Sequence, residues 1–140
     1  MEKLINILLV EDDLLDVIDI RRTLDKMNIL YHLDVARNGE EALEYLDTPR
    51  SYRPDIALID INMPKMNGLE FLAKLRENEN WKDLKSFIIT TSDEISDRKT
   101  AMALGVSGYI VKPLKLNNAS SIDAFNLMID LLNMKTVVNN

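Results

Sequence analysis

Five short, mainly apolar runs alternate with five stretches of helical spacing along this chain, and this alternation constrains the fold more than any other feature. The runs cover residues 4–10, 33–36, 56–59, 87–91 and 109–111. Short apolar runs bounded by turn signals are typical of strands buried on both faces of a parallel sheet. A strand followed by a helix returns to a parallel neighbour. The sequence therefore predicts an α/β fold in which helices cover both faces of a five-stranded parallel sheet.

The apolar spacing between these runs predicts where each helix lies. Asp13 can cap the first helix. The expected apolar positions of that helix are Leu14, Leu15, Ile18, Leu24 and Met27. Further helices are predicted over 40–46, 69–78 and 95–104, and Gly105 supplies a left-handed cap for the last of these. Ser120 or Ser121 can cap a final helix, whose expected apolar face is Ile122, Phe125, Met128, Ile129 and Leu132.

The composition excludes several classes of protein and of site. The 140 residues suit one domain with a full-sized core. A net charge of −6 argues against a nucleic-acid or anionic-membrane surface, because such a surface needs clustered basic residues. The absence of cysteine excludes disulfides and thiolate metal sites, and the single histidine, His32, is expected to be a surface or core residue. No apolar run approaches the roughly 20 residues of a membrane span, so we expect a reduced, cytoplasmic setting.

Polar side chains that can carry chemistry stand at the ends of four predicted strands. Glu11 and Asp12 follow the first run, Asp60 follows the third, Thr90 lies at the end of the fourth and Lys112 follows the fifth. The carboxyl ends of parallel strands share one edge of the sheet, where ligands bind in α/β folds, so we expect these residues to converge. Carboxylates held close together need a cation, and an all-oxygen ligand set suits Mg²⁺.

An aspartate beside a bound cation is a candidate nucleophile for phosphoryl transfer. Asp60 would attack phosphorus, Lys112 would supply a second positive charge, and the Thr90 hydroxyl could donate a hydrogen bond to a phosphoryl oxygen. Each residue also has a structural interpretation: Asp60 can cap a loop, Glu11 and Asp12 can be solvated acids, Thr90 a strand residue and Lys112 a surface charge. Their convergence on one edge favours a functional site.

Four motifs at these strand ends resemble the receiver domain of two-component response regulators. They are Val10-Glu11-Asp12-Asp13, Leu58-Ile59-Asp60-Ile61-Asn62-Met63-Pro64 with Gly68, Ile89-Thr90-Thr91-Ser92 and Gly108-Tyr109-Ile110-Val111-Lys112-Pro113. The resemblance extends from about Lys3 to Leu132. It implies a CheY-like, flavodoxin-like (βα)5 fold with strand order 2-1-3-4-5, in a receiver domain over residues 3–134 that is followed by a tail over 135–140.

The resemblance also implies a role for each residue of the site. Asp60 accepts a phosphoryl group from a histidine kinase or a histidine phosphotransfer protein. Mg²⁺ is held by Glu11, Asp12 and Asp60 together with the backbone carbonyl of Asn62. Thr90 binds the phosphoryl group. Lys112 pairs with Asp60 or its phosphate, and the Lys112-Pro113 peptide bond is cis.

A switch is implied as well. Phosphorylation adds charge and acceptor oxygens, so Thr90 moves toward the phosphoryl group and Tyr109 turns inward. The helix over 95–104, the fifth strand and the last helix then present a changed surface to a downstream protein target. The competing interpretation of Tyr109 is a half-buried strand aromatic. Only 27 residues follow Pro113, so we expect no nucleic-acid-binding region and an output by protein contact.

Two features resemble a subfamily, the stand-alone response regulators associated with bacterial phytochromes. The predicted loop over 48–55 is longer than in compact receivers, and Thr91-Ser92-Asp93 follows Thr90. That subfamily implies a homodimer built on the same surface. Asn62 and Ser92 occupy the two family positions that tune loss of the phosphoryl group.

Two other functions compete with this interpretation. A phosphatase of the haloacid-dehalogenase type also uses an aspartate nucleophile, Mg²⁺, threonine and lysine. It needs a second acid two residues after the nucleophile, where this chain has Asn62, and it needs a cap domain. A receiver-like scaffold that acts without phosphorylation has no need to keep like charges adjacent. We therefore expect a signalling protein that assists its own phosphorylation and hydrolysis and is not an enzyme with an outside substrate.

Overall fold

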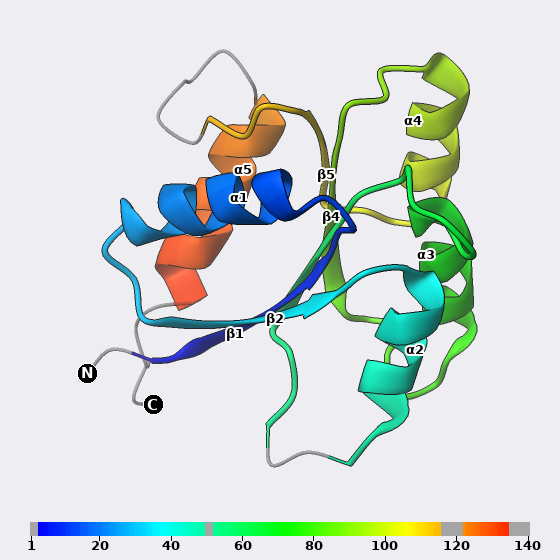
Figure 1. Ribbon diagram of the computed structural model, residues 1–140, viewed down its shortest axis with the longest axis horizontal. Helices are drawn as coiled ribbons and strands as arrows, with labels where there is room; N and C mark the ends of the chain where they lie inside the picture. The colour runs from blue at the N-terminus through cyan, green and yellow to red at the C-terminus, as the bar shows by residue number, and fades with distance from the viewer. Residues whose placement is uncertain (1–2, 50–51, 116–121, 135–140) are drawn as a thin grey trace.

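A five-stranded parallel sheet forms the centre of the computed structural model, which describes residues 3–49, 52–115 and 122–134 (Figure 1). The strand order is β2-β1-β3-β4-β5, and each neighbouring pair is parallel. The strands are β1 (Ile5–Val10), β2 (Tyr31–Ala36), β3 (Ile56–Ile59), β4 (Lys85–Thr90) and β5 (Gly108–Val111). The predicted fold class and strand order are confirmed.

Helices cover both faces of this sheet, as Figure 1 shows. One face carries α1 (Leu14–Asp25) and α5 (Ile122–Met134). The other face carries α2 (Gly39–Asp47), α3 (Gly68–Glu77) and α4 (Ile95–Ala103). Each face therefore has its own apolar cluster, with the sheet between them. Among the described helices, none combines the length and the apolar character that a membrane span requires.

The central strands explain the uniform apolar runs of the sequence. Every residue of β3 is buried, and in β1 only Asn6 is partly exposed. Val10 pairs with Ile59 in the register of β1 and β3, and Thr90 pairs with Val111 in that of β4 and β5. The register thus brings the carboxyl ends of these four strands to one edge, which places the residues that follow them close together.

The predicted apolar face of α1 is wrong at its first turn. The helix buries Val17, Ile20 and Leu24, whereas Leu14 and Leu15 are 70% and 72% exposed. The helix begins three residues after Glu11, so its first turn lies beside the strand end and not over the apolar face of the sheet. Helical spacing shows which residues share a side of a helix, but it does not show where the sheet beneath them ends.

The predicted face of α5 is also wrong in part. Ala124, Leu127 and Leu131 are buried, whereas Ile129 is 37% exposed. Met128 and Leu132 pack against the edge of the cluster and are partly buried. This stretch is apolar at so many positions that spacing alone fits more than one face. The predicted caps at Ser120 and Ser121, the side chains of Ile122 and Phe125, and the predicted tail over 136–140 lie outside the described residues.

The single histidine takes part in a polar cluster on β2. Nε2 of His32 lies 2.9 Å from Oδ1 of Asp34 and 2.9 Å from the hydroxyl of Tyr52. The hydroxyls of Tyr45 and Tyr52 donate to Oδ2 of Asp34 over 2.6 and 2.9 Å. These contacts join α2 and the long connection before β3 to the edge strand. They are consistent with the structural role that was expected for His32.

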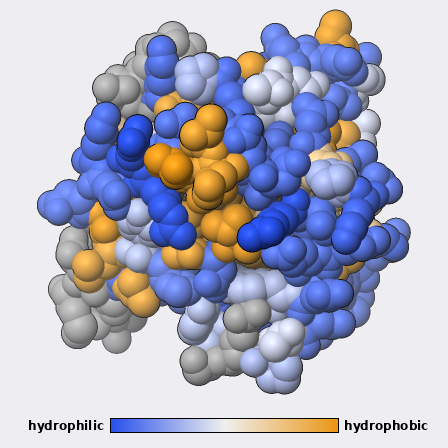
Figure 2. All heavy atoms as spheres, viewed as in Figure 1, coloured by the Kyte–Doolittle hydropathy of each residue, from blue (hydrophilic) through white to orange (hydrophobic). Residues whose placement is uncertain are grey.

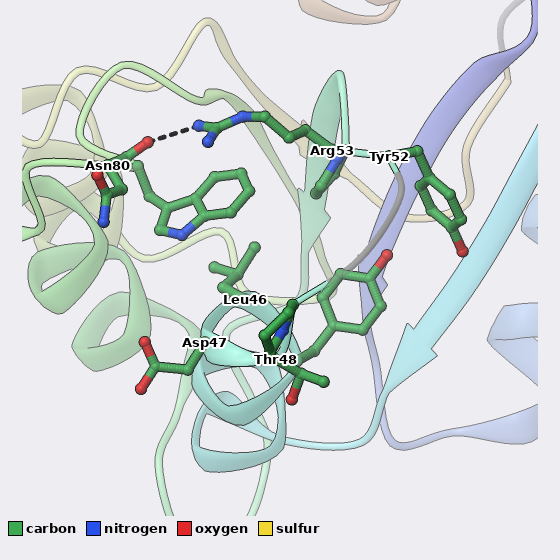
Figure 3. Close-up of a pocket in the computed structure, with 10 residues that line it drawn as sticks. Leu46, Asp47, Thr48, Tyr52, Arg53 and Asn80 are labelled. Atoms are coloured by element: carbon green, nitrogen blue, oxygen red, sulfur yellow. Dashed lines mark hydrogen bonds between the residues drawn. The ribbon is translucent and has the colours of Figure 1, made fainter.

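The connection between α2 and β3 also packs against the segment before β4. Arg53 lies over the ring of Trp81 at 4.0 Å and donates to the carbonyl of Asn80 over 2.6 Å (Figure 3). A cavity of about 210 Å³ lies between these residues and the C-terminal end of α2. It adjoins the segments that lead into β3 and β4, so it lies at the opposite edge of the sheet from Asp60.

Candidate functional site

The ends of β1, β3, β4 and β5 bring the predicted site residues to one edge of the sheet. Glu11, Asp60 and Lys112 each directly follow a strand, and Thr90 is the last residue of β4. The amide of Asp60 donates to the carbonyl of Val10 over 2.9 Å, and the amide of Lys112 donates to the carbonyl of Thr90 over 2.8 Å. The hydrogen bonds of the sheet therefore continue to these residues and hold the backbone from which each side chain projects.

Glu11, Asp12 and Asp60 form a cluster of carboxylates at this edge. One oxygen of each lies within 4.8 Å of the others. Glu11 and Asp60 are buried, whereas Asp12 is exposed. Within the described part of the chain, Oδ1 of Asp60 is buried and accepts no hydrogen bond. A buried carboxylate oxygen without a hydrogen-bond partner is unfavourable in free energy, so the cluster fits a hard cation such as Mg²⁺. The exposed side chain of Asp12 can bind such a cation from the solvent side.

Lys112 reaches the same cluster from the end of β5. Its Nζ lies 2.5 Å from Oε1 of Glu11, 2.7 Å from Oδ2 of Asp16 and 3.4 Å from Oδ2 of Asp60. The Lys112-Pro113 peptide bond is cis, as the resemblance implied. The structure thus brings Lys112 to the predicted acids and adds Asp16, which the sequence interpretation missed. The sequence signal for Asp16 was its place as an acid in the first turn of the helix that follows Glu11. The helix dipole alone also favours an acid at that position, so the signal did not indicate a contact with Lys112.

Burial and neighbouring charges shift the pKa of two groups in the cluster. Burial raises the pKa of Glu11 to about 7, the hydrogen bond from Lys112 opposes this shift, and the charge of Asp60 adds to it. Burial alone would lower the pKa of Lys112, but the hydrogen bonds to Asp16 and Glu11, together with the charges of Asp60 and Glu11, raise that pKa above its ordinary range. Lys112 therefore remains charged at neutral pH, and Glu11 holds a proton more readily than an exposed glutamate does.

Thr90 and Tyr109 connect the edge of the sheet to the loop before α4. Thr90 is fully buried, and its Oγ1 accepts a hydrogen bond from the amide of Ser92 over 3.3 Å. Tyr109 is 2% exposed, and its hydroxyl donates to the carbonyl of Ser92 over 2.8 Å. The guanidinium of Arg98, on α4, lies over the Tyr109 ring at 4.7 Å. The ring of Tyr109 thus lies inward in this structure and is linked to the loop that follows Thr90.

Gly68 brings the N-terminus of α3 against the backbone of Asp60. Its amide donates to the carbonyl of Ile61 over 3.0 Å. A Cβ at this position would lie 2.1 Å from the carbonyl oxygen of Asp60, closer than any side chain can approach. The helix is capped by Asn67, whose side chain and that of Glu70 form a reciprocal capping box. Asn62 lies two residues after Asp60 and is exposed. The turn that contains it is therefore held at both ends.

Comparisons with known proteins agree on one family. A family model described as the response regulator receiver domain matches residues 7–122. Response regulator MprA of Mycolicibacterium vanbaalenii is 33% identical over 112 residues, which are 80% of this chain and 46% of MprA. Response regulator Rcp1 of a Synechocystis species is 32% identical over 116 residues, which are 80% of this chain and 79% of Rcp1. This chain therefore spans less than half the length of MprA.

Solved structures give the same result for nearly the whole chain. The Mn²⁺-bound form of Rcp1 has a TM-score of 0.75 at 29% identity and covers 95% of this chain and 96% of its own. A two-component response regulator from Legionella pneumophila has a TM-score of 0.77 at 32% identity, with 93% and 99% covered. The bacteriophytochrome response regulator AtBRR has a TM-score of 0.75 at 31% identity, with 99% of both chains covered.

Proposed function

We propose that Asp60 accepts the phosphoryl group, because this chain belongs to the response regulator receiver domain family. The chain is thus a phosphorylation-based switch of two-component signalling. One observation carries this assignment. Oδ1 of Asp60 is buried without a hydrogen-bond partner among the described residues, and Oδ2 lies 3.4 Å from the ammonium of Lys112. Asp60 therefore has one oxygen without a partner, which a metal ion can bind, and the ammonium of Lys112 beside the other.

Glu11, Asp12 and Asp60, with the backbone carbonyl of Asn62, would hold Mg²⁺. The mutual distances of the three carboxylates and the free oxygen of Asp60 support this set. When bound, Mg²⁺ would neutralise the acids and stabilise the charge on the phosphoryl oxygens. The structure of Rcp1 with Mn²⁺ shows that a relative binds a divalent cation.

The transfer itself is a displacement at phosphorus. A carboxylate oxygen of Asp60 forms the new O–P bond while the bond from phosphorus to the imidazole nitrogen of the donor breaks. Lys112 forms an ion pair with one phosphoryl oxygen. The hydroxyl of Thr90 leaves the amide of Ser92 and donates a hydrogen bond to a second phosphoryl oxygen. Tyr109 responds because its hydroxyl donates to the same loop, at the carbonyl of Ser92. The chain promotes its own phosphorylation and hydrolysis and turns over no outside substrate.

The phosphoryl donor would be a sensor histidine kinase or a histidine phosphotransfer protein. Leu14 and Leu15 are exposed in the first turn of α1, directly after the acidic cluster. Figure 2 shows a hydrophobic patch over α1, on the face of the molecule that faces the viewer. An exposed apolar patch beside a reactive group is a contact surface for the protein that brings the phosphoryl group.

The output surface would be formed by α4, β5 and α5, through which the chain contacts a downstream protein or a second copy of itself. Ile95 and Met102 on α4 are 70% and 59% exposed, and Ile129 on α5 is 37% exposed. This surface adjoins Tyr109, so a change at Thr90 can alter it. The unit that switches would be a receiver domain over residues 3–134, followed by a tail over 135–140 and located in the cytoplasm.

Intact-mass spectrometry after incubation with acetyl phosphate tests the assignment. The wild-type protein should gain one phosphoryl group only when Mg²⁺ is present, and the adduct should be stable in acid and labile in base. Asp60→Asn should gain none. Asp55→Asn, which removes a carboxylate at the opposite edge of the sheet, is the matched control and should be labelled like the wild type. Labelling of Asp60→Asn would overturn the proposal.

A further inference from the structure

The contact between Lys112 and Asp16 has no part in the phosphoryl transfer described above. Asp16 lies in the first turn of α1, its Oδ2 is 2.7 Å from Nζ of Lys112, and its side chain is 30% exposed. The contact from Nζ to Asp60 is longer, at 3.4 Å. The ammonium is therefore held closer to α1 than to the proposed phosphoacceptor.

Lys112 and a metal ion would compete for the same two acids. Glu11 and Asp60 both contact Nζ, and both belong to the carboxylate cluster that fits Mg²⁺. Two cations in a pocket with little solvent repel each other, so the metal ion needs the ammonium to move or to lose its hold on these acids. Among the described residues, Asp16 is the carboxylate that contacts Lys112 without belonging to that cluster.

We infer that Asp16 is a positioning residue, which shares the ammonium of Lys112 with Glu11, holds it off Asp60 and so leaves Asp60 available to Mg²⁺. The inference deepens the proposed function and rests on it. Without the Asp16 carboxylate, Lys112 would keep Glu11 and Asp60 as its acidic partners among the described residues. Its contact with Asp60 would strengthen, and Mg²⁺ would have to break it.

The substitution Asp16→Asn should therefore weaken the binding of Mg²⁺. Loss of a residue that orients a metal site from outside typically reduces metal affinity 10- to 100-fold, and we expect roughly tenfold because Asp16 is partly solvated. Asp16→Glu keeps the charge on the same turn and should restore most of the affinity. The dissociation constant of Mg²⁺ is measured by isothermal titration calorimetry, without acetyl phosphate, and thermal melting checks that each variant is folded.

Asp19→Asn is the matched control. Asp19 is exposed on the same helix, one turn further along, and its carboxylate makes no hydrogen bond or ion pair with Lys112 in the described structure. The substitution removes the same charge at nearly the same place. It should change the dissociation constant by less than about twofold, as expected for a screened surface charge.

A second pair of variants tests whether Asp16 acts through Lys112. Lys112→Met removes the competing ammonium, so Asp16→Asn in that background should weaken Mg²⁺ binding no more than Asp19→Asn does. Equal effects of Asp16→Asn with and without Lys112 would show that Asp16 is only a nearby charge and would overturn the inference. Equal effects of Asp16→Asn and Asp19→Asn in the otherwise wild-type protein would overturn it too.

The proposed function fails in a different way from this inference. A wild-type protein that neither binds Mg²⁺ nor gains a phosphoryl group would overturn the proposed function, and the role of Asp16 with it. A wild-type protein that binds Mg²⁺ and is phosphorylated, beside an Asp16→Asn variant with the same Mg²⁺ affinity, would overturn the role of Asp16 alone.

Discussion

Replacing Gly68 with alanine should destabilise the protein and displace the backbone of Asp60. In a helix, alanine is usually favoured over glycine by about 0.5–1 kcal/mol. Here the added Cβ would lie 2.1 Å from the carbonyl oxygen of Asp60 and 2.9 Å from Cγ2 of Ile59. Ile59 is the last residue of β3 and Asp60 directly follows it, and the hydrogen bonds of the sheet hold both in place, so the helix or the turn must move. Overpacking of this kind costs roughly 1–3 kcal/mol, and we expect a net loss of about 1–2 kcal/mol.

Urea unfolding measured by circular dichroism gives the change in the free energy of unfolding for Gly68→Ala. Lys74→Ala, at an exposed position of the same helix, is the control and should stay within about 0.5 kcal/mol of the wild type. The rate of labelling by acetyl phosphate should fall for Gly68→Ala and stay unchanged for Lys74→Ala. A Gly68→Ala variant as stable as the wild type, or more stable, with unchanged labelling would refute the argument from the close contact.

Three further predictions concern the site and its supports. Lys112→Ala should still be labelled at Asp60 but should show a weaker structural response, followed by the NMR shifts of α4 and β5 residues; an unchanged response would remove Lys112 from the switch. Because the pKa of Glu11 is raised to about 7, protons compete with Mg²⁺ below that pH, so Mg²⁺ affinity should fall by up to about tenfold per pH unit. Calorimetric titrations on either side of neutral pH check this, and Glu11→Gln should flatten the dependence; an affinity independent of pH in the wild type would contradict it. Asn67→Ala removes a helix cap whose side chain accepts a hydrogen bond from the amide of Glu70 over 2.9 Å, and it should lower the free energy of unfolding by about 1 kcal/mol. An unchanged urea midpoint would show that the cap contributes nothing.

The fold could be predicted from the sequence because its central strands leave no ambiguity. Each position of β3 is buried, and the acid that follows it comes at the end of the strand. Parallel strands share an edge, so the end of each apolar run also placed Glu11, Asp60 and Lys112 together. The ends of buried strands therefore carry the most information in a sequence of this type.

The helix faces and the contact between Asp16 and Lys112 could not be predicted in the same way. Leu14 and Leu15 fit the helical spacing but lie past the end of the sheet, so they remain exposed. Ile129 fits one apolar face of α5, while the sheet contacts another, through Leu127 and Leu131. Asp16 meets Lys112 across 96 residues of sequence, and neither residue type specifies that contact. Such contacts depend on how the helices pack, which apolar spacing alone does not determine.

The most direct test of the account is to locate the phosphoryl group on the chain. The wild-type protein is phosphorylated with acetyl phosphate and Mg²⁺ and reduced with borohydride, which converts a phosphorylated aspartate to homoserine, and its peptides are then sequenced by mass spectrometry. We expect homoserine at position 60, in the peptide that continues into Ile61 and Asn62. Homoserine at Asp12, Asp16 or any other acid, with Asp60 unmodified, would contradict it.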